Sequence, residues 1–197
     1  SVFETLIVRD IRQKYKIRNP GLLEKLANFL MDNISSEVST RSLADTLTSY
    51  KEKTNDKSIG SYLQYLTNAY AFYKVRRYDI RGKKYLASQD KYYLCDHAFR
   101  YAKLGTKNLD FGRMYENIVA IELLRRGYEV YTGVLYKKEI DFVAIRHDEK
   151  VYIQVSDDIT YKQTFERETA PLFQIKDAYP KMIIARTRHE PYQYEGV

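Results

Sequence analysis

The stretch EVYTGVLYKKEIDFVAIRHDEKVYIQVS, residues 129–156, decides the fold class. It separates into the segments Glu129–Leu135, Ile140–Arg146 and Val151–Val155, which are rich in the β-branched and aromatic residues typical of strands. Residues 147–150 are polar and form the predicted tip of a hairpin between the last two segments. The stretch therefore predicts three consecutive strands.

Helical patterns flank these strands. Residues 111–126 form a predicted helix that ends at Gly127, because a residue without a Cβ suits the left-handed position after a helix. Residues 161–176 are also predicted to be helical, with a break near Pro171, and residues 182–185 form a predicted buried strand. The order helix, three strands, helix, strand predicts an α/β domain whose mixed sheet is flanked by helices.

The first half of the chain begins with short amphipathic helices. Their predicted starts are capping residues: Asn19 ahead of Pro20, Ser39, and either Asn55 or Asp56. Each helix has one apolar stripe, so we expect the helices to share one core.

A β-hairpin is predicted after these helices. Residues 71–78 alternate as a strand, Arg81 and Gly82 supply a turn, and residues 91–94 return as a second strand. Helices followed by a hairpin favour a winged-helix-like region. The fold class of the whole chain is therefore α+β.

The two patterns change at the short polar segment 105–108. We expect a winged-helix-like domain over residues 1–104 and an α/β domain over residues 105–197. A length of 197 residues suits two small domains or one large domain.

The composition excludes several classes of protein. With 44% hydrophobic and 30% charged residues, the chain is neither disordered nor a disulfide-stapled scaffold. No apolar run approaches the roughly 20 residues that cross a bilayer, and residues 1–10 lack the pattern of a signal peptide. A single cysteine, Cys95, cannot form an internal disulfide. We therefore expect a cytoplasmic protein that does not contact membranes.

Glu116 is the first candidate site residue. At helical spacing its neighbours Val119, Ala120 and Leu123 are all apolar, so the carboxylate is predicted to face the core. A buried carboxylate needs a partner such as a cation, a hydrogen-bond donor or a metal ion.

Asp141 and Gln154 are the next candidates. Strand alternation places Asp141 on an apolar face, which the acid interrupts. Two hairpin registers are open, and they place Asp141 opposite either Gln154 or Ser156 on the same side of the sheet. Polar side chains are therefore predicted to converge at this position.

A divalent metal ion is one partner that such a group would suit. Mg²⁺ and Mn²⁺ prefer oxygen ligands, and Glu116, Asp141 and Gln154 would offer carboxylate and amide oxygens. This composition suits metal-assisted hydrolysis of a phosphodiester.

An acid on a helix, an Asp on the second strand and a polar-apolar-polar triplet on the third strand resemble the PD-(D/E)XK nuclease superfamily. More narrowly, the chain is similar to the C-terminal region of prokaryotic AAA-type ATPases, a domain of unknown function that follows the ATPase module. The segments that carry the resemblance are 11–19, 22–33, 77–84, 91–93, Tyr115-Glu116-Asn117, Glu139-Ile140-Asp141-Phe142 and 168–181.

The resemblance implies a restriction-endonuclease-like core after a winged-helix region. It also implies catalytic and metal-binding roles for Glu116, Asp141 and Gln154, and an ATPase module on the same polypeptide as a partner. No phosphate-binding GxxxxGK[ST] loop occurs in this chain, so ATP hydrolysis would require that preceding module.

The third nuclease motif departs from the superfamily pattern. It ends in Lys in the superfamily, whereas this chain has Gln154-Val155-Ser156. Gln154 can bind a metal through its amide oxygen but adds no charge. Ser156 takes the lysine position as the fourth candidate catalytic residue, and its neutral hydroxyl replaces little of the charge stabilisation that lysine gives the phosphate. A substitute lysine is an open alternative, and the nearest in sequence are Lys137, Lys138 and Lys162. Two interpretations stay open: a nuclease-derived site, active or degenerate, or structural roles in which Asp141 caps a strand end or forms an ion pair.

A basic hairpin rich in tyrosine is the second candidate site. Its candidate nucleic-acid-binding cations are Lys74, Arg76, Arg77, Arg81, Lys83 and Lys84. The chain has 33 Lys and Arg against 26 Asp and Glu, and this net charge of +7 permits a polyanionic partner.

Sequence-tolerant contact is expected because the helix over residues 57–68 has a single cation, Lys57, on its polar face. The alternatives are a solvated hairpin or a hairpin that docks on an acidic surface of the ATPase module. Two functional classes thus remain: a nucleic-acid-binding module with a possible metal-dependent nuclease site, and a non-catalytic module that binds proteins or regulates the ATPase.

Overall fold

A computed structural model describes residues 3, 5, 8–49, 54–105, 110–186 and 190–197. The chain forms two compact units, one made of Ser1–Lys74 and Gln89–Leu109 and the other of Val75–Ser88 and Asp110–Val197. The strands follow the order β1-β3-β2-β4-β5-β6-β7. The predicted α+β fold class, with a helical region, a hairpin and a mixed sheet flanked by helices, is confirmed.

The hairpin formed by β2 (Phe72–Asp79) and β3 (Lys84–Leu94) contributes to both units. The sequence predicted one boundary, between residues 104 and 105, whereas the compact units divide the hairpin itself. The physical reason is that Arg76 to Asp79 of β2 pair in parallel with Tyr131 to Val134 of β4, a strand of the second unit.

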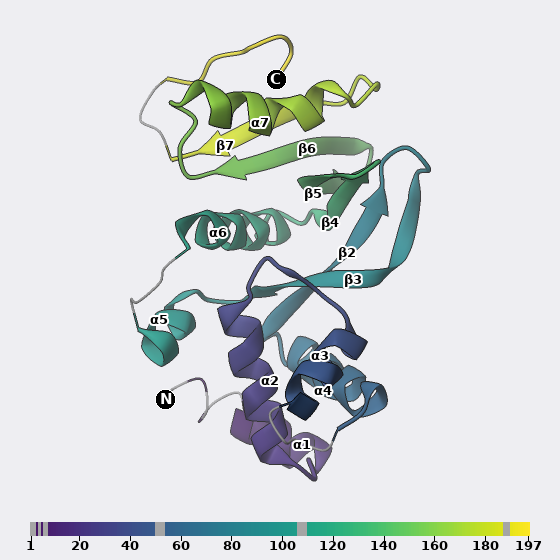
Figure 1. Ribbon diagram of the computed structural model, residues 1–197, viewed down its shortest axis with the longest axis vertical. Helices are drawn as coiled ribbons and strands as arrows, with labels where there is room; N and C mark the ends of the chain where they lie inside the picture. The colour runs from purple at the N-terminus through teal and green to yellow at the C-terminus, as the bar shows by residue number, and fades with distance from the viewer. Residues whose placement is uncertain (1–2, 4, 6–7, 50–53, 106–109, 187–189) are drawn as a thin grey trace. The chain divides into compact units, whose positions relative to one another are not determined.

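The first unit is mainly helical (Figure 1). Its elements are α1 (Arg9–Tyr15), α2 (Pro20–Asp32), β1 (Glu37–Val38), α3 (Thr40–Ser49), α4 (Asp56–Asn68) and α5 (Ala98–Leu104), together with the proximal part of the hairpin. Three predicted caps are present: the side chains of Asn19, Ser39 and Asn55 accept hydrogen bonds from Leu22 N at 3.0 Å, Ser42 N at 3.0 Å and Ser58 N at 2.9 Å. These caps fix where α2, α3 and α4 begin.

One hydrophobic core joins the helices of this unit. Leu23 and Leu26 of α2, Leu43 of α3 and Ile59 of α4 are buried within it. The short strand β1 pairs antiparallel with β3, where Glu37 lies opposite Lys91. The three capped helices thus share a core, as predicted.

The second unit contains strands at the four positions that the sequence predicted, but the prediction that the last one is buried is wrong, because β7 is the last strand in the sheet order and exposes Met182 and Ile184. Its elements, besides the distal hairpin, are α6 (Phe111–Arg125), β4 (Glu129–Leu135), β5 (Lys138–Arg146), β6 (Glu149–Ser156), α7 (Lys162–Phe173) and β7 (Lys181–Ala185). The helix α7 continues through Pro171 and ends two residues later. A proline so close to the helix end removes a hydrogen bond from the last turn only.

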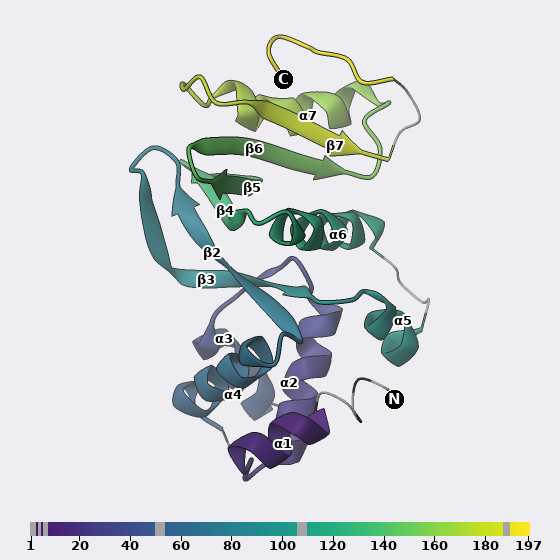
Figure 2. The ribbon, with the colours of Figure 1, turned by 180° about the vertical axis from the view of Figure 1, so that it is seen from behind.

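Helices cover both faces of this sheet. In Figures 1 and 2, β6 and β7 lie between α6 and α7, and both helices contact β6. Tyr152 of β6 belongs to a core with Leu172 and Ile175 at the end of α7, which identifies the face that α7 covers. Because side chains alternate along a strand, Gln154 and Ser156 point to the same face as Tyr152.

No helix in the described part of the chain is long and apolar enough to span a membrane.

Candidate functional site

The regular antiparallel pairing between β5 and β6 ends next to Asp141 and Gln154. Regular pairing extends from Arg146 opposite Glu149 to Phe142 opposite Ile153, so the next facing pair is Asp141 and Gln154. This selects the first of the two predicted registers.

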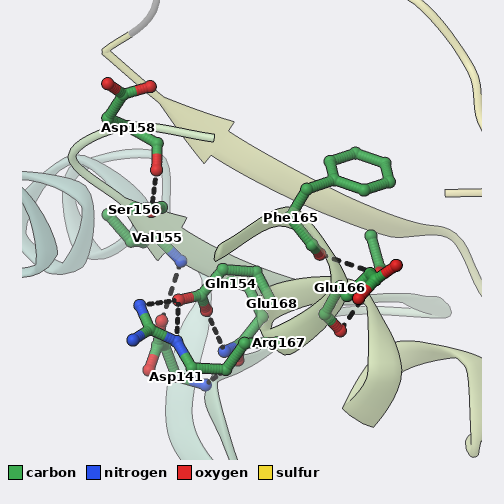
Figure 3. Close-up of polar contacts among 10 residues, drawn as sticks. Asp141, Gln154, Val155, Ser156, Asp158, Phe165, Glu166, Arg167 and Glu168 are labelled. Carbon is green, nitrogen blue, oxygen red and sulfur yellow. Dashed lines mark hydrogen bonds and ion pairs between the residues drawn. The ribbon is translucent and has the colours of Figure 1, made fainter. Parts of the chain in front are cut away.

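Side chains replace main-chain partners at this point. The Asp141 main-chain N–H donates to Oε1 of Gln154 at 2.8 Å, and the Val155 N–H donates to Oδ2 of Asp141 at 2.7 Å (Figure 3). The strands separate here, and the two side chains satisfy main-chain groups that the ladder leaves unpaired.

Glu168 and Arg167 of α7 extend the arrangement. Nε2 of Gln154 donates to Oε2 of Glu168 at 3.1 Å, and Nη2 of Arg167 approaches Oε1 of Glu168 at 2.7 Å (Figure 3). The Glu168 side chain is 11% exposed and that of Arg167 is 72% exposed. We call Asp141, Gln154, Arg167 and Glu168 the polar cluster.

Sequence reasoning missed Glu168 as a member of the site. The signal was present, because Glu168 lies three and four positions before Pro171 and Leu172, which are buried on the inner side of α7. This is the same pattern of an acid among apolar helical neighbours that drew attention to Glu116.

Glu116 lies on α6, the helix on the other face of β6, and is half-buried. The buried positions of α6 are Met114, Asn117, Ala120 and Leu123. Their spacing of three residues centres the buried stripe on Asn117 rather than on its neighbour, so the predicted core-facing placement of Glu116 is corrected to the flank of the stripe. The structure brings together Asp141 and Gln154, while Glu116 belongs to a different helical layer.

Ser156 lies two residues after Gln154 on β6 and is buried. Its hydroxyl donates to the main-chain oxygen of Asp158 at 3.2 Å (Figure 3). This hydrogen bond holds the turn that follows β6, and the side chain adds no positive charge to the polar cluster.

A divalent cation fits the polar cluster poorly. Oδ2 of Asp141 and Oε1 of Gln154 already accept main-chain N–H groups, and the Glu168 carboxylate is neutralised by Arg167. Among the residues that the structure describes, no group of three or more His, Cys, Asp or Glu side chains could hold a metal ion. The hydrogen bonds described here form a network that joins Asp141, Gln154 and Glu168 to the main chain of β5 and β6.

The predicted cations of the hairpin fall into two groups. Lys74 forms an ion pair with Asp90 at 2.8 Å, and Arg77 is half-buried. Arg76, Arg81, Lys83 and Lys84 are exposed, and the last three lie in or beside the turn between β2 and β3. Oδ1 of Asp79 accepts hydrogen bonds from the N–H groups of Arg81 and Gly82 at 3.1 and 3.0 Å, which fixes the shape of this turn.

The turn between β4 and β5 lies next to the hairpin turn. Parallel pairing of β2 with β4 brings their carboxyl ends to the same edge, and Ile80 N donates to Val134 O at 3.0 Å. The Arg81 guanidinium carbon lies 5.3 Å from the ring centroid of Tyr136, a residue of the second turn. The two turns thus form one surface.

This surface contains more cations than the hairpin alone. Lys137 of the β4–β5 turn and Lys138, the first residue of β5, are exposed. We call Arg81, Lys83, Lys84, Lys137 and Lys138 the two-turn basic surface. As far as the chain is described, none of these cations forms an ion pair with a carboxylate. Sequence reasoning did not include Lys137 and Lys138 because the parallel pairing of β2 and β4 is not visible in local patterns.

Residues 1–110 match a protein family described as "Domain of unknown function (DUF8612)". The chain belongs to this family. It is 38% identical over 196 residues to an uncharacterized protein of Haemophilus influenzae, a match that covers 100% of this chain and 48% of the relative. It is also 30% identical over 154 residues to the uncharacterized protein MJ1544 of Methanocaldococcus jannaschii, covering 76% of this chain and 34% of that protein. No solved structure matches the chain.

The extent of the family match separates the two candidate sites. The matched residues 1–110 include Arg81, Lys83 and Lys84 but end before the polar cluster. The Haemophilus relative aligns with the whole chain, so both candidate sites lie within that alignment. The chain spans less than half the length of either of these relatives.

Proposed function

We propose that this chain binds nucleic acid through the two-turn basic surface and that it does not cut the strand it binds. The observation that carries the proposal is the gathering of exposed cations from two turns that lack carboxylate partners among the described residues. Phosphate contacts from such cations supply affinity without reading sequence.

The polar cluster supports the second half of the proposal. Cleavage would require a cation held by Asp141 and Gln154 and a cationic side chain near the phosphate. Oδ2 of Asp141 and Oε1 of Gln154 each accept a main-chain N–H group, and Ser156 stands where the superfamily motif has lysine. We infer a nuclease-like core whose catalytic centre has become a structural one.

The arrangement of the first unit favours the same function. The order α2, β1, α3, α4 and the β2–β3 hairpin, with β1 paired to β3, supports our proposal that this part of the chain is winged-helix-like. Winged-helix modules contact DNA in many proteins, and this fold-level analogy raises the expectation of nucleic-acid binding without assigning contact residues.

Affinity measured against salt tests the proposal. Fluorescence anisotropy with a labelled 20-nucleotide strand and its duplex should give a dissociation constant that rises steeply between about 50 and 200 mM salt. The labelled strands should stay intact in gels after incubation with Mg²⁺ or Mn²⁺. Affinity that does not change with salt would contradict phosphate contact, and metal-dependent products that disappear in Asp141→Ala would contradict the absence of cleavage.

The ATPase partner is a second part of the proposal. We infer that this chain is a module of a longer polypeptide that carries an AAA-type ATPase, supported by the sequence resemblance and by relatives more than twice its length. The full-length Haemophilus relative should hydrolyse ATP in a phosphate-release assay, and a purified full-length protein without ATPase activity would contradict this part. A reducing cytoplasm suits the single free Cys95.

Protein binding is the competing function, and one observation favours it. The last strand in the sheet order, β7, exposes Met182 by 40% and Ile184 by 38%. An edge strand with exposed apolar side chains is a place where another chain can pair. Loss of ATPase regulation in Met182→Lys, with unchanged nucleic-acid affinity, would support this alternative.

A further inference from the structure

Tyr136 is the most exposed aromatic residue on the two-turn basic surface. The residue is 66% exposed, and its backbone has a φ of 57°, the left-handed conformation that turns the chain from β4 into β5. A large side chain in this conformation is uncommon, since asparagine or glycine adopts it at lower cost. A tyrosine at this tip therefore presents a ring to solvent where a small polar residue would make a better turn.

The Arg81 guanidinium is a neighbour of this ring. With Cζ 5.3 Å from the centroid, the cation lies over the Tyr136 ring. An exposed ring with a cation over one side can stack on a base with its other side, and the arginine adds positive charge at the same place. The pair combines the two groups that recognise a nucleotide, a flat aromatic surface and a phosphate-binding cation.

A second exposed tyrosine, Tyr85 on the hairpin, also has an arginine near its ring. Tyr85 is 53% exposed, and its ring lies 5.0 Å from that of Tyr131 and 5.7 Å from that of Tyr78. The Arg76 guanidinium carbon lies 5.4 Å from its centroid. Tyr85 is partly committed to packing, whereas Tyr136 has the cation as its ring contact, so Tyr136 is the residue through which stacking can be tested.

Exposed aromatic rings among lysines favour binding of a single strand over binding of a duplex. Bases in a duplex are stacked on each other and offer only their edges, so an exposed ring gains nothing from a duplex. Bases in a single strand offer their π-faces, and stacking on an aromatic side chain contributes about 1–3 kcal/mol per base. The polar face of α4, the helix in the groove-reading position, includes a single lysine, Lys57, which further disfavours duplex reading.

We propose that the two-turn basic surface is a single-strand binding site in which a base stacks on Tyr136 while the surrounding lysines contact the flanking phosphates. This inference rests on the proposed function and specifies its ligand. It predicts that affinity for a single strand has two separable parts, one from the backbone charge and one from the bases.

Fluorescence anisotropy with three labelled probes separates these parts: a 20-nucleotide oligothymidine, an oligomer of abasic sites of the same length, and a mixed-sequence duplex of 20 base pairs. The wild-type chain should bind oligothymidine about tenfold more tightly than the abasic oligomer at the same salt concentration. Tyr136→Ala should reduce oligothymidine affinity to the abasic level and leave abasic affinity unchanged.

Two variants serve as controls for fold and for the loss of any exposed ring. Tyr136→Phe should retain the wild-type affinity because the aromatic surface remains. Tyr161→Ala removes a tyrosine that is 72% exposed at the start of α7, away from these turns in sequence, and should also bind as wild type. Circular dichroism melting curves that coincide for all variants confirm that the fold is kept.

The outcomes distinguish the inference from the function on which it rests. The single-strand inference is overturned, while salt-dependent binding stands, in either of two cases. In the first, Tyr136→Ala binds oligothymidine as tightly as wild type. In the second, the wild-type chain binds the duplex as tightly as oligothymidine, and unlabelled single strand does not displace the duplex. If none of the probes binds at about 50 mM salt, both the inference and the proposed function are overturned.

Discussion

The polar cluster and the two-turn basic surface lie in the same unit, yet their charged groups have opposite surroundings. In the polar cluster, Asp141, Gln154 and Glu168 satisfy one another and the ends of two strands at distances of 2.7 to 3.1 Å. On the basic surface, Lys137 and Lys138 are exposed and have no carboxylate partner within the described ranges of the chain.

This contrast explains why a motif that resembles a catalytic centre is assigned a structural role here. A buried or half-buried group that already has a hydrogen-bond partner in the protein loses stability if that partner is removed. An exposed group without a partner costs little to keep and is available to an anion from outside. We therefore expect ligand binding at the two-turn basic surface, where the cations have no carboxylate partner among the described residues.

The largest effect is expected on stability, at the strands β2, β4 and β5 that join the two turns. Gly133 of β4 lies opposite Tyr78 of β2 and Ile140 of β5, and a Cβ built on it would lie 2.9 Å from atoms of Ile140, Ile80 and Val143. Gly133→Ala should lower the free energy of unfolding by up to about 3 kcal/mol through overpacking. Urea denaturation measures this, with Gly112→Ala as the control, because its Cβ would meet nothing closer than 3.4 Å.

If Gly133→Ala were as stable as wild type, the packing of β2, β4 and β5 at this point would be looser than described, and the link between the turns would lose its support.

The polar cluster should give the next largest effect, and the effect should be on stability. Asp141→Ala leaves the N–H of Val155 without its partner, which should cost about 2 kcal/mol in urea denaturation. Glu166→Ala, on the exposed side of α7, is the matched control and should change stability little. A fully stable Asp141→Ala would indicate that the carboxylate is kept for chemistry rather than for structure.

Charge reversal on the basic surface should affect binding and leave the fold intact. Lys137→Glu combined with Lys138→Glu should weaken binding of a single-stranded 20-mer at least tenfold and lower the salt slope by about 1.4, at about 0.7 per phosphate contact. Lys162→Glu combined with Lys176→Glu makes the same change of net charge at exposed positions on and after α7. Equal losses in both double variants would mean that overall charge, not this surface, determines affinity.

The smallest effect is expected on the pH dependence of stability, at Tyr152 in the core beside the polar cluster. The Tyr152 hydroxyl donates to Oδ2 of Asp177 at 2.5 Å, and burial together with this carboxylate raises the pKa of Tyr152. A raised pKa in the folded state means that the contribution to stability is complete below the ordinary value of about 10 and is lost as the pH rises through the folded value.

Tyr152→Phe should therefore be less stable than wild type by about 1 kcal/mol at pH 7 to 9, and the difference should shrink above about pH 10. Urea midpoints measured across this range provide the check. A difference that grows with pH would contradict the assigned direction of the shift.

Local patterns in the sequence predicted much of this fold. Capping residues such as Asn19 and Asn55 marked the starts of helices because a cap and its helix are neighbours in the chain. Strand alternation limited the residue opposite Asp141 to Gln154 or Ser156, and the structure shows the register that leads to Gln154.

The parts that escaped prediction depend on contacts distant in sequence. The bond from Gln154 to Glu168 depends on how α7 packs against β6, and the approach of Arg81 to Tyr136 depends on the parallel pairing of β2 with β4. Neither contact can be predicted from the spacing of these residues in the sequence. For Glu116, the predicted buried face of α6 is wrong by one residue, because the buried residues of this helix recur every three positions through Asn117.

The most direct test is one experiment on one labelled single-stranded 20-mer, in which affinity and strand integrity are followed together with Mg²⁺ present. The wild-type chain and Asp141→Ala, assayed below its urea transition, should bind with the same affinity and leave the strand whole, while the variant with Glu at positions 137 and 138 should bind at least tenfold more weakly. Cleavage by the wild-type chain that Asp141→Ala abolishes, with affinity unaffected by the lysine changes, would contradict the account.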